Sequence, residues 1–237
     1  GTGVPVVSKE TVGRQGKTDG QPAHTREAKL GCVFTQTTWD QEGYPIRDPH
    51  STTYTGAIET AEEFGKRLYL EAWKRGWSRA QKKVVMGDGA EWIWNQADLH
   101  FPGAVQIVDL YHARQHLAQA AQARYPSQAD QAKRWYEHMS QALYCGHVRT
   151  IITDLQAGNL PEQASYFQTH QRRMQYQAFR EDGYPIGSGA VESGVKQFKQ
   201  RLTGAGMRWS RPGAERMLVI RSAVLSGTLN ELWPSAA

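Results

Sequence analysis

The sequence contains only two cysteines, Cys32 and Cys145, and they lie far apart in the chain. Neither belongs to a CxxC pair, so the spacing of a thiolate metal site is absent. A domain held together by several disulfides is excluded as well, because two cysteines form one bridge at most. This cysteine usage fits a reducing compartment, and we expect a cytoplasmic protein.

Long apolar runs are also lacking. No run approaches the ~20 residues that a membrane span requires, and no secretory signal segment is found, so we expect no membrane partner. Internal repeats and low-complexity tracts are missing too. With 237 residues, 39% of them apolar, the chain has the size of one globular domain with an insertion, or of two small domains.

Negative charge is scarce in the last quarter of the chain. Residues 171–237 contain ten Lys and Arg but only five Asp and Glu, which accounts for the whole net charge of +5. A localised basic segment is typical of a protein that binds a polyanion. The alternative is a solvated basic surface without a partner.

Two short apolar runs end abruptly at an aspartate: residues 83–87 precede Asp88, and residues 104–108 precede Asp109. Such runs predict buried strands. Carboxylates at the carboxyl ends of neighbouring strands lie at the edge where open α/β sheets bind ligands. The glycines on both sides of Asp88 leave room for a ligand near the backbone. Alternatively, both aspartates are only N-caps of the helices that follow.

The predicted elements follow the order β-β-β-α-β-α-β and then continue as helices alone. A capping box from Thr60 to Glu63 begins the first helix. We expect strands at residues 1–8, 29–38, 51–56, 83–87 and 104–108, a short helix at 91–99, and later helices at 111–124, 128–144, 148–157, 162–179 and 190–202.

This order is that of a ribonuclease H-like core. We therefore predict an α/β fold with a mixed sheet of three antiparallel and two further strands, flanked by helices, and an all-α insertion before the last catalytic helix. In that fold the active carboxylates come from the first strand, the end of the fourth strand and a helix after the fifth. Asp88 corresponds to the second place and Glu192 to the third. Alternatively, Glu192 only stabilises a helix N-terminus that has Ser188 as its N-cap.

Several longer strings carry a resemblance to a known family: GTGVP, REAKLGCVFTQT, STTYTGAIETAEEFG, GDGAEWIWN, QIVDLYHARQHL, YPIGSGAVES and GMRWS. From its first residue to about residue 230, the chain resembles the Kra-type family of bacterial insertion-sequence transposases. That family belongs to the Mutator-like Asp-Asp-Glu transposases. The resemblance implies a core in two parts, residues 1–110 and 183–237, interrupted by a helical insertion at 111–182.

The resemblance also implies roles for four residues. Asp88 is the second acid of the catalytic triad and Glu192 is the third, while Asp109 and His112 form the Asp-x-x-His signature of Mutator-like enzymes. In the family an Asp precedes GTGVP, whereas this chain begins at that first glycine. We expect the first acid to lie upstream and the chain as given to be catalytically inactive. Neither Asp19 nor Asp40 lies at a strand position that could replace it.

The chemistry explains why such an enzyme needs several acids. In-line attack on a phosphodiester requires the attacking and leaving oxygens to be held and compensated in charge, which two Mg²⁺ ions ~3.5–4 Å apart achieve. These ions take oxygen ligands from carboxylates, water and phosphate. We expect Asp88 to hold one ion and Glu192 the other, with Mn²⁺ as a substitute for Mg²⁺.

Asp109, His112 and His116 lie at positions i, i+3 and i+7 of a predicted helix. Zinc binding is one alternative, since histidines four residues apart can chelate, but Ala113 stands where the zincin pattern requires Glu. We favour a role for His112 in orienting a carboxylate or donating to a phosphate. For His116, a functional role and an ordinary, partly exposed position on an amphipathic helix are equal alternatives.

Basic and aromatic residues follow Glu192. Basic side chains interleaved with an aromatic ring suit phosphate contacts and base stacking, although a solvated cationic helix face is the alternative for each residue. The candidates for DNA binding are Lys196, Lys199, Arg201, Arg208 and Trp209, with Arg211 next to them. We expect Trp92 and Trp94 to lie in the core or in the wall of a cleft. Trp135, Tyr136 and Phe167 in the helical insertion are expected to serve packing.

Together these features predict the catalytic domain of a transposase that cuts DNA at element ends and joins the freed 3′-hydroxyl to target DNA. We expect it to form a homo-oligomer on DNA and to gather on the nucleoid. Two alternatives stay open: a DNA-binding remnant without catalysis, and a ribonuclease H-like nuclease without strand transfer.

Overall fold

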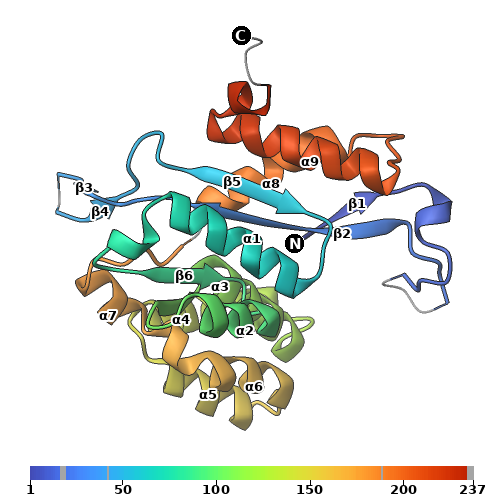
Figure 1. Cartoon of the computed structure of the whole chain (residues 1–237). Helices are drawn as coiled ribbons and strands as arrows, with labels where there is room; N and C mark the ends of the chain where they lie inside the picture. The colour runs from blue at the N-terminus through green and yellow to red at the C-terminus, as the bar shows by residue number, and fades with distance from the viewer. Residues whose placement is uncertain (17–19, 42, 188, 234–237) are drawn as a thin grey trace. The chain divides into compact units, whose positions relative to one another are not determined.

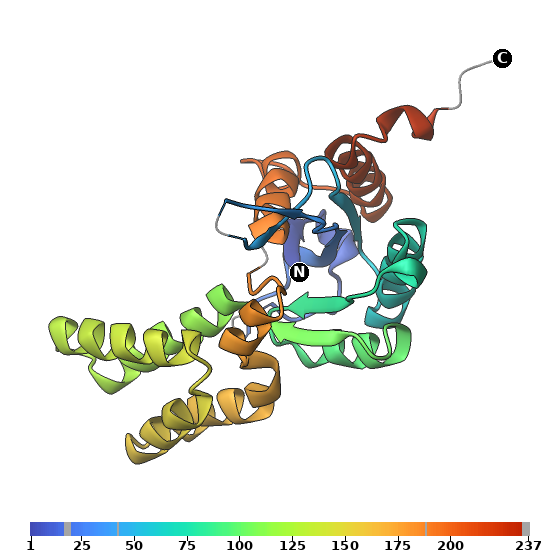
Figure 2. The ribbon, with the colours of Figure 1, turned by 90° about the vertical axis from the view of Figure 1, so that its left-hand side faces the viewer.

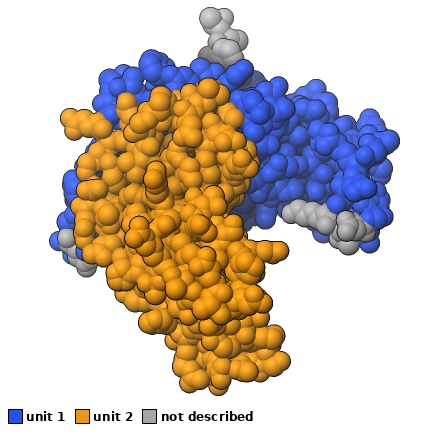
Figure 3. Space-filling model, turned by 90° about the horizontal axis from the view of Figure 1, so that it is seen from below, with its two compact units in different colours: residues 1–80, 189–237 blue, residues 81–188 orange. Residues whose placement is uncertain are grey.

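The computed structural model describes residues 1–237 apart from 17–19, 42, 188 and 234–237. The chain divides into two compact units, shown in different colours in Figure 3. Unit 1 consists of Gly1–Ala80 and Gly189–Ala237, and unit 2 consists of Gln81–Ser188. Each unit has a hydrophobic cluster of its own.

A three-stranded antiparallel sheet organises unit 1 (Figure 1). Its central strand is β2 (Thr25–Val33), which pairs with β1 (Thr2–Pro5) along one edge and β5 (Thr53–Ala57) along the other. The three predicted N-terminal strands are thus confirmed, although β1 ends at Pro5 rather than at residue 8 and β2 ends at Val33 rather than at residue 38. We expected β2 to begin at residue 29, but it begins at Thr25. The reason is that Thr25 and its neighbours pair with β1, and this pairing overrides the low strand propensity of a polar stretch.

The two faces of this sheet are distinguished by the alternation of side chains along β2. Gly31 faces α1, since a Cβ added there would lie 3.0 Å from a methyl group of Leu68. On the opposite face, Leu30 packs with Phe198 and Leu218 in the cluster of unit 1. The helices that cover the two faces are α1 (Ala61–Lys74) on the first, and α8 (Gly189–Leu202) and α9 (Arg211–Ser226) on the second.

The sequence predicts two of the three α-helices described in unit 1. The capping box at Thr60 is confirmed, with the Glu63 N–H donating to the Thr60 hydroxyl and the Glu63 carboxylate accepting from the Thr60 N–H. No helix was predicted for α9, although Ser210 caps it and Gly227 ends it with a φ of 71°. Short 3₁₀ segments complete the unit: Ser8–Glu10, Trp77–Arg79 and Leu229–Leu232.

A small hairpin separates β2 from β5. Its strands are β3 (Thr38–Trp39) and β4 (Pro45–Ile46), for which the sequence analysis predicts no hairpin. The carboxylate of Asp48 organises it by accepting from the hydroxyl of Thr35 and from the N–H groups of Thr37 and Thr38. The Thr35 hydroxyl, with these other donors, holds the pKa of Asp48 well below its usual range.

Unit 2 begins with a parallel pair of strands. β6 (Val84–Gly87) and β7 (Val105–Val108) pair from Val84↔Val105 to Gly87↔Val108, and α2 (Glu91–His100) connects them. All three elements lie where the sequence predicts them.

The rest of unit 2 is helical. Figure 2 shows the pair formed by α3 and α4, which pack against each other, as α5 and α6 do. The helices are α3 (Leu110–Arg124), α4 (Ala129–Tyr144), α5 (Val148–Ala157), α6 (Pro161–His170) and α7 (Tyr176–Glu181). The predictions at 111–124, 128–144 and 148–157 are confirmed.

The single helix predicted at residues 162–179 is wrong. α6 ends at His170, a 3₁₀ turn follows at Gln171–Met174, and α7 starts after Gln175. The break directs Met174 and Tyr176, two residues apart, into the same core, and both are fully buried. Residues two apart on a continuous α-helix point about 200° apart, so an unbroken helix could not bury both in this way.

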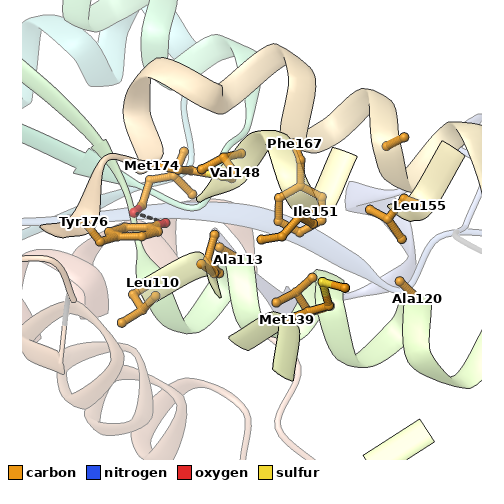
Figure 4. Packing of buried hydrophobic residues seen from close by; sticks show 14 of the residues in the cluster. Leu110, Ala113, Ala120, Met139, Val148, Ile151, Leu155, Phe167, Met174 and Tyr176 are labelled. Atoms are coloured by element: carbon orange, nitrogen blue, oxygen red, sulfur yellow. Dashed lines mark hydrogen bonds between the residues drawn. The ribbon is translucent and has the colours of Figure 1, made fainter. Parts of the chain in front are cut away.

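Figure 4 shows the core that these helices enclose. Leu110 and Ala113 from α3, Ile151 from α5 and Phe167 from α6 meet there. The Tyr176 hydroxyl donates to the Val108 carbonyl at 2.9 Å, which fastens α7 to the end of β7.

The predicted α/β class is confirmed. In the described ranges the strands form three sheets, β1-β2-β5, β3-β4 and β6-β7. These strands do not pair into the single mixed sheet predicted for a ribonuclease H-like core, and that finer assignment stays a prediction. The division by packing also differs from the predicted ranges 1–110, 111–182 and 183–237, since β6, α2 and β7 pack with the later helices. Across the described residues, no helix combines the length and apolarity needed to cross a membrane.

Candidate functional site

Asp88 lies directly after β6, in the turn before α2. Gly89, which follows it, has a φ of +99°, a backbone conformation that residues other than glycine rarely adopt. One carboxylate oxygen of Asp88 accepts from the Ala90 N–H at 3.1 Å. Ala90, not Asp88, is the N-cap residue of α2, so the N-cap alternative is wrong for Asp88.

Asp109 lies directly after β7 and has different surroundings. Its side chain is 1% exposed, and one oxygen accepts from the N–H groups of Tyr111 at 2.8 Å and His112 at 3.1 Å. Asp109 is therefore the N-cap of α3. The structural alternative holds for this residue, and a catalytic role for it stays a prediction.

The two aspartates nevertheless share one edge of the β6–β7 pair, as the sequence predicts. The strands run parallel and in register up to Gly87↔Val108. The Asp109 N–H donates to the Gly87 carbonyl at 2.8 Å, which continues the ladder by one residue. Parallel strands thus bring both acidic positions to their carboxyl ends, where α/β proteins bind ligands.

His112 is oriented by Asp109. Its Nδ1 lies 3.4 Å from a carboxylate oxygen of Asp109, and about a third of the side chain is exposed. A carboxylate in that place can hold the imidazole in one orientation, which is the arrangement expected of a histidine that supports a reacting group. A role of His112 at phosphate stays a prediction.

His116, one turn further along α3, packs against an aromatic ring. Its ring stacks on Tyr166 with centroids 3.6 Å apart and an interplanar angle of 18°. Burial lowers the pKa of His116, and the neighbouring His112 adds to this while Asp88 opposes it. Packing therefore accounts for His116.

Two side chains that sequence reasoning missed contact the Asp88 turn. The Tyr166 hydroxyl donates to the Asp88 carbonyl at 3.4 Å, and His170 has a backbone hydrogen bond to Gly89. Burial lowers the pKa of His170, which is 5% exposed, with Arg173 and His116 adding to this and the bond to Gly89 opposing it. Both residues belong to α6, far from Asp88 in the chain, and a helical pattern carries no signal of such a contact.

Glu192 lies in the first turn of α8, as predicted, and is half-buried. It belongs to unit 1, whereas Asp88, Asp109 and His112 belong to unit 2. Next to it, the Ala190 carbonyl accepts from the Tyr54 hydroxyl at 3.1 Å, which ties the start of α8 to β5. The predicted N-cap, Ser188, lies outside the described residues, as does Asp19. Asp40 accepts from the Tyr44 N–H in the turn of the β3–β4 hairpin.

The predicted DNA-binding residues fall into two groups. Four basic side chains are exposed on α8 and in the segment after it: Lys196, Lys199, Arg201 and Arg208. Trp209 instead packs against the cluster of unit 1 and donates its indole N–H to the Leu202 carbonyl at 3.0 Å. Arg211 pairs with Glu215 at 2.8 Å. The structure thus gives Trp209 a packing role, and base stacking by it stays a prediction.

The residues expected to serve packing mostly do so. Trp94, Trp135 and Phe167 are buried in the cluster of unit 2, and Tyr136 is half-buried against it. The Trp135 indole donates to Asp154, which also receives the guanidinium of Arg124, so one carboxylate ties α3, α4 and α5 together.

Comparison of the chain with protein-family models, with curated proteins and with solved structures returned no match.

Proposed function

We propose that this chain is the catalytic domain of a DNA transposase of the Mutator-like Asp-Asp-Glu type. The observation that carries the proposal is the arrival of Asp88 and Asp109 at one edge of a parallel strand pair. Asp88 in particular is not needed as an N-cap, which leaves its carboxylate available for chemistry. The resemblance of the sequence to Kra-type insertion-sequence transposases supplies the reaction class.

The donor atoms suit magnesium. Asp88 and Glu192 would present carboxylate oxygens, which are the ligands that Mg²⁺ and Mn²⁺ prefer. One oxygen of Asp88 is oriented by the Ala90 N–H. When bound, two such ions compensate the charge that develops on the scissile phosphate and activate the attacking water.

In the proposed reaction, a water oxygen attacks phosphorus at an element end, the P–O3′ bond breaks, and the 3′ oxygen leaves as a hydroxyl. The oxygen of that hydroxyl then attacks a phosphodiester of target DNA and forms a new P–O bond. The P–O3′ bond of the target strand breaks, and its 3′ oxygen leaves as a hydroxyl with a proton equivalent to the one that the attacking hydroxyl lost. His112, oriented by Asp109, would donate a hydrogen bond to a phosphate oxygen. The exposed Lys196, Lys199, Arg201 and Arg208 would neutralise backbone phosphates.

A nicking assay tests this proposal. Protein that carries an Asp directly before Gly1 is incubated with element-end DNA and Mg²⁺, alongside the Asp88→Asn and Glu192→Gln variants. We expect each substitution to lower the nicking rate at least about 100-fold, since a lost metal ligand removes several kcal/mol of transition-state stabilisation. Asp130→Asn and Glu162→Gln change exposed acids in helical first turns and should leave the rate unchanged.

Retention of nicking by Glu192→Gln would show that the assigned triad is wrong. A DNA-binding protein without catalysis is the second candidate, and the exposed basic residues around α8 favour it. It predicts salt-dependent DNA binding that survives both acid substitutions while no nicking occurs under any condition. A strand-transfer assay with labelled target DNA separates a transposase, which joins the two DNAs, from a nuclease, which only cuts.

A further inference from the structure

The turn that carries Asp88 is intrinsically loose. Glycines lie on both sides of the aspartate, and Gly89 is in the left-handed region, so the local backbone has many accessible conformations. A metal ligand, however, must be held to within about 0.5 Å of its productive position. The turn therefore needs support from elsewhere in unit 2.

Tyr166 supplies that support. Its ring lies so close to Gly89 that a Cβ added there would be 3.0 Å from Cε2 and from the hydroxyl oxygen. The same hydroxyl donates to the Asp88 carbonyl at 3.4 Å. The ring therefore covers the turn on the side of Gly89, and a Cβ there would push the ring away by a few tenths of an ångström in addition to straining the backbone.

Tyr166 is itself immobilised by rings from two helices. His116 of α3 stacks on it, while Phe167 and His170 of α6 meet it edge-on, with centroids 5.3 and 5.0 Å away. Because Asp109 is the N-cap of α3, the helix that follows this aspartate carries His116, which packs on the ring that supports the Asp88 turn. Behind His170, the Trp94 ring and the Arg173 guanidinium continue the packing, with the guanidinium 4.6 Å from the ring centroid.

From this geometry we infer that Tyr166 is a positioning residue, which fixes the Asp88 turn and thereby the carboxylate that the proposed reaction uses. On this inference α6 helps to position the Asp88 carboxylate, because a displacement of this helix would displace the turn. The inference rests on the proposed function for its catalytic consequence, but the contact between Tyr166 and the turn can be tested without it.

Hydrogen exchange tests the contact directly. We expect the amides of residues 87–90 to lose protection in Tyr166→Ala, while urea unfolding still shows a folded protein. Tyr136→Ala is the matched control, since Tyr136 is a half-buried tyrosine that packs on the same cluster. Unchanged protection of the turn in Tyr166→Ala would overturn the inference, whether or not the protein nicks DNA.

Kinetics test the consequence. In nicking-competent protein, we expect Tyr166→Ala to lower kcat about 10- to 100-fold and to raise the Mg²⁺ concentration at half-saturation, with KM for DNA unchanged. Tyr166→Phe keeps the stacked ring and loses only the hydroxyl, so it should recover most of the rate. A loss that appears in KM alone, or an unchanged kcat in Tyr166→Ala, would contradict a positioning role. If no variant nicks DNA, the proposed function fails and the exchange experiment still decides the contact.

Discussion

Asp88 and Asp109 follow equivalent strands, yet their surroundings separate their roles. Asp109 is buried and accepts two N–H groups at the start of α3, whereas Asp88 is half-buried and accepts one. The first arrangement is that of a helix cap, which stabilises the fold whatever else the residue does. The second leaves more of the carboxylate for a ligand.

This difference leads to a prediction for Asp109. Asp109→Ala should lower the free energy of unfolding by about 1–2 kcal/mol, because the Tyr111 and His112 N–H groups lose their acceptor. Asp109→Asn should cost less, since Asn also caps helices. Urea unfolding at neutral pH measures both. If Asp109→Asn keeps stability but abolishes nicking, the charge of Asp109 has a function beyond capping; equal stability of Asp109→Ala and the parent would contradict the capping role.

The buried histidines predict how stability depends on pH. The pKa values of His116 and His170 are lowered in the folded protein, mainly by burial. In the unfolded chain these histidines have the ordinary histidine pKa of about 6.5. As the pH is lowered, the unfolded chain therefore takes up protons at a higher pH than the folded protein does. Their contribution to stability is thus complete above that pH and decreases as the pH falls below it.

We expect the urea concentration at the unfolding midpoint to decrease as the pH is lowered from 7.5 to 5.5. The decrease should be smaller in His116→Phe, which keeps an aromatic ring against Tyr166 but cannot titrate. His138→Phe is a control, because His138 lies outside this cluster. A pH dependence that is the same in His116→Phe as in the parent would show that His116 is not one of the groups responsible.

At the scale of elements, the packing of α8 on the sheet depends on the absence of a side chain at Gly194. An added Cβ there would overlap the Tyr54 ring, which is held by its hydroxyl bond to the Ala190 carbonyl. α8 carries Glu192, so this contact also fixes the start of the helix that bears the proposed third acid.

Gly194→Ala should therefore lower the free energy of unfolding by about 1–2 kcal/mol. Overpacking costs about 1–3 kcal/mol and outweighs the gain in helix propensity of up to about 1 kcal/mol. The same substitution at Gly189, where an added Cβ meets nothing within 4 Å, should cause no loss. Thermal or urea unfolding distinguishes the two. A stabilised Gly194→Ala protein would mean that Tyr54 moves aside without cost.

For the whole molecule, the division into units makes a prediction about folding. Unit 2 is one continuous stretch with a cluster that includes Ile107, Leu117, Leu143, Ile151 and Phe167, all fully buried. Residues 81–188 expressed alone should therefore fold and unfold cooperatively, with a urea m-value in the range of about 1–3 kcal/mol/M for small proteins. Phe167→Ala should lower its stability by about 3–5 kcal/mol. A non-cooperative transition would show that unit 2 depends on unit 1.

Local patterns in the chain are enough to predict most helices and strands, and the places of the acids among them. The capping box at Thr60, the apolar runs before Asp88 and Asp109 and most of the helices are local patterns, and they are found where expected. Such patterns fail where tertiary contacts decide. β2 starts early because it pairs with β1, and the helix after residue 161 breaks so that Met174 and Tyr176 reach one core.

The surroundings of Asp88 and Asp109, in contrast, are set by tertiary contacts. Whether an aspartate after a strand is a helix cap or a freer carboxylate depends on the donors it meets, and Asp88 and Asp109 differ in this although their sequence contexts are alike. The ring of Tyr166 reaches the Asp88 turn from a helix distant in the chain. Contacts between residues so far apart arise from packing, which leaves no periodic or local trace in a single sequence.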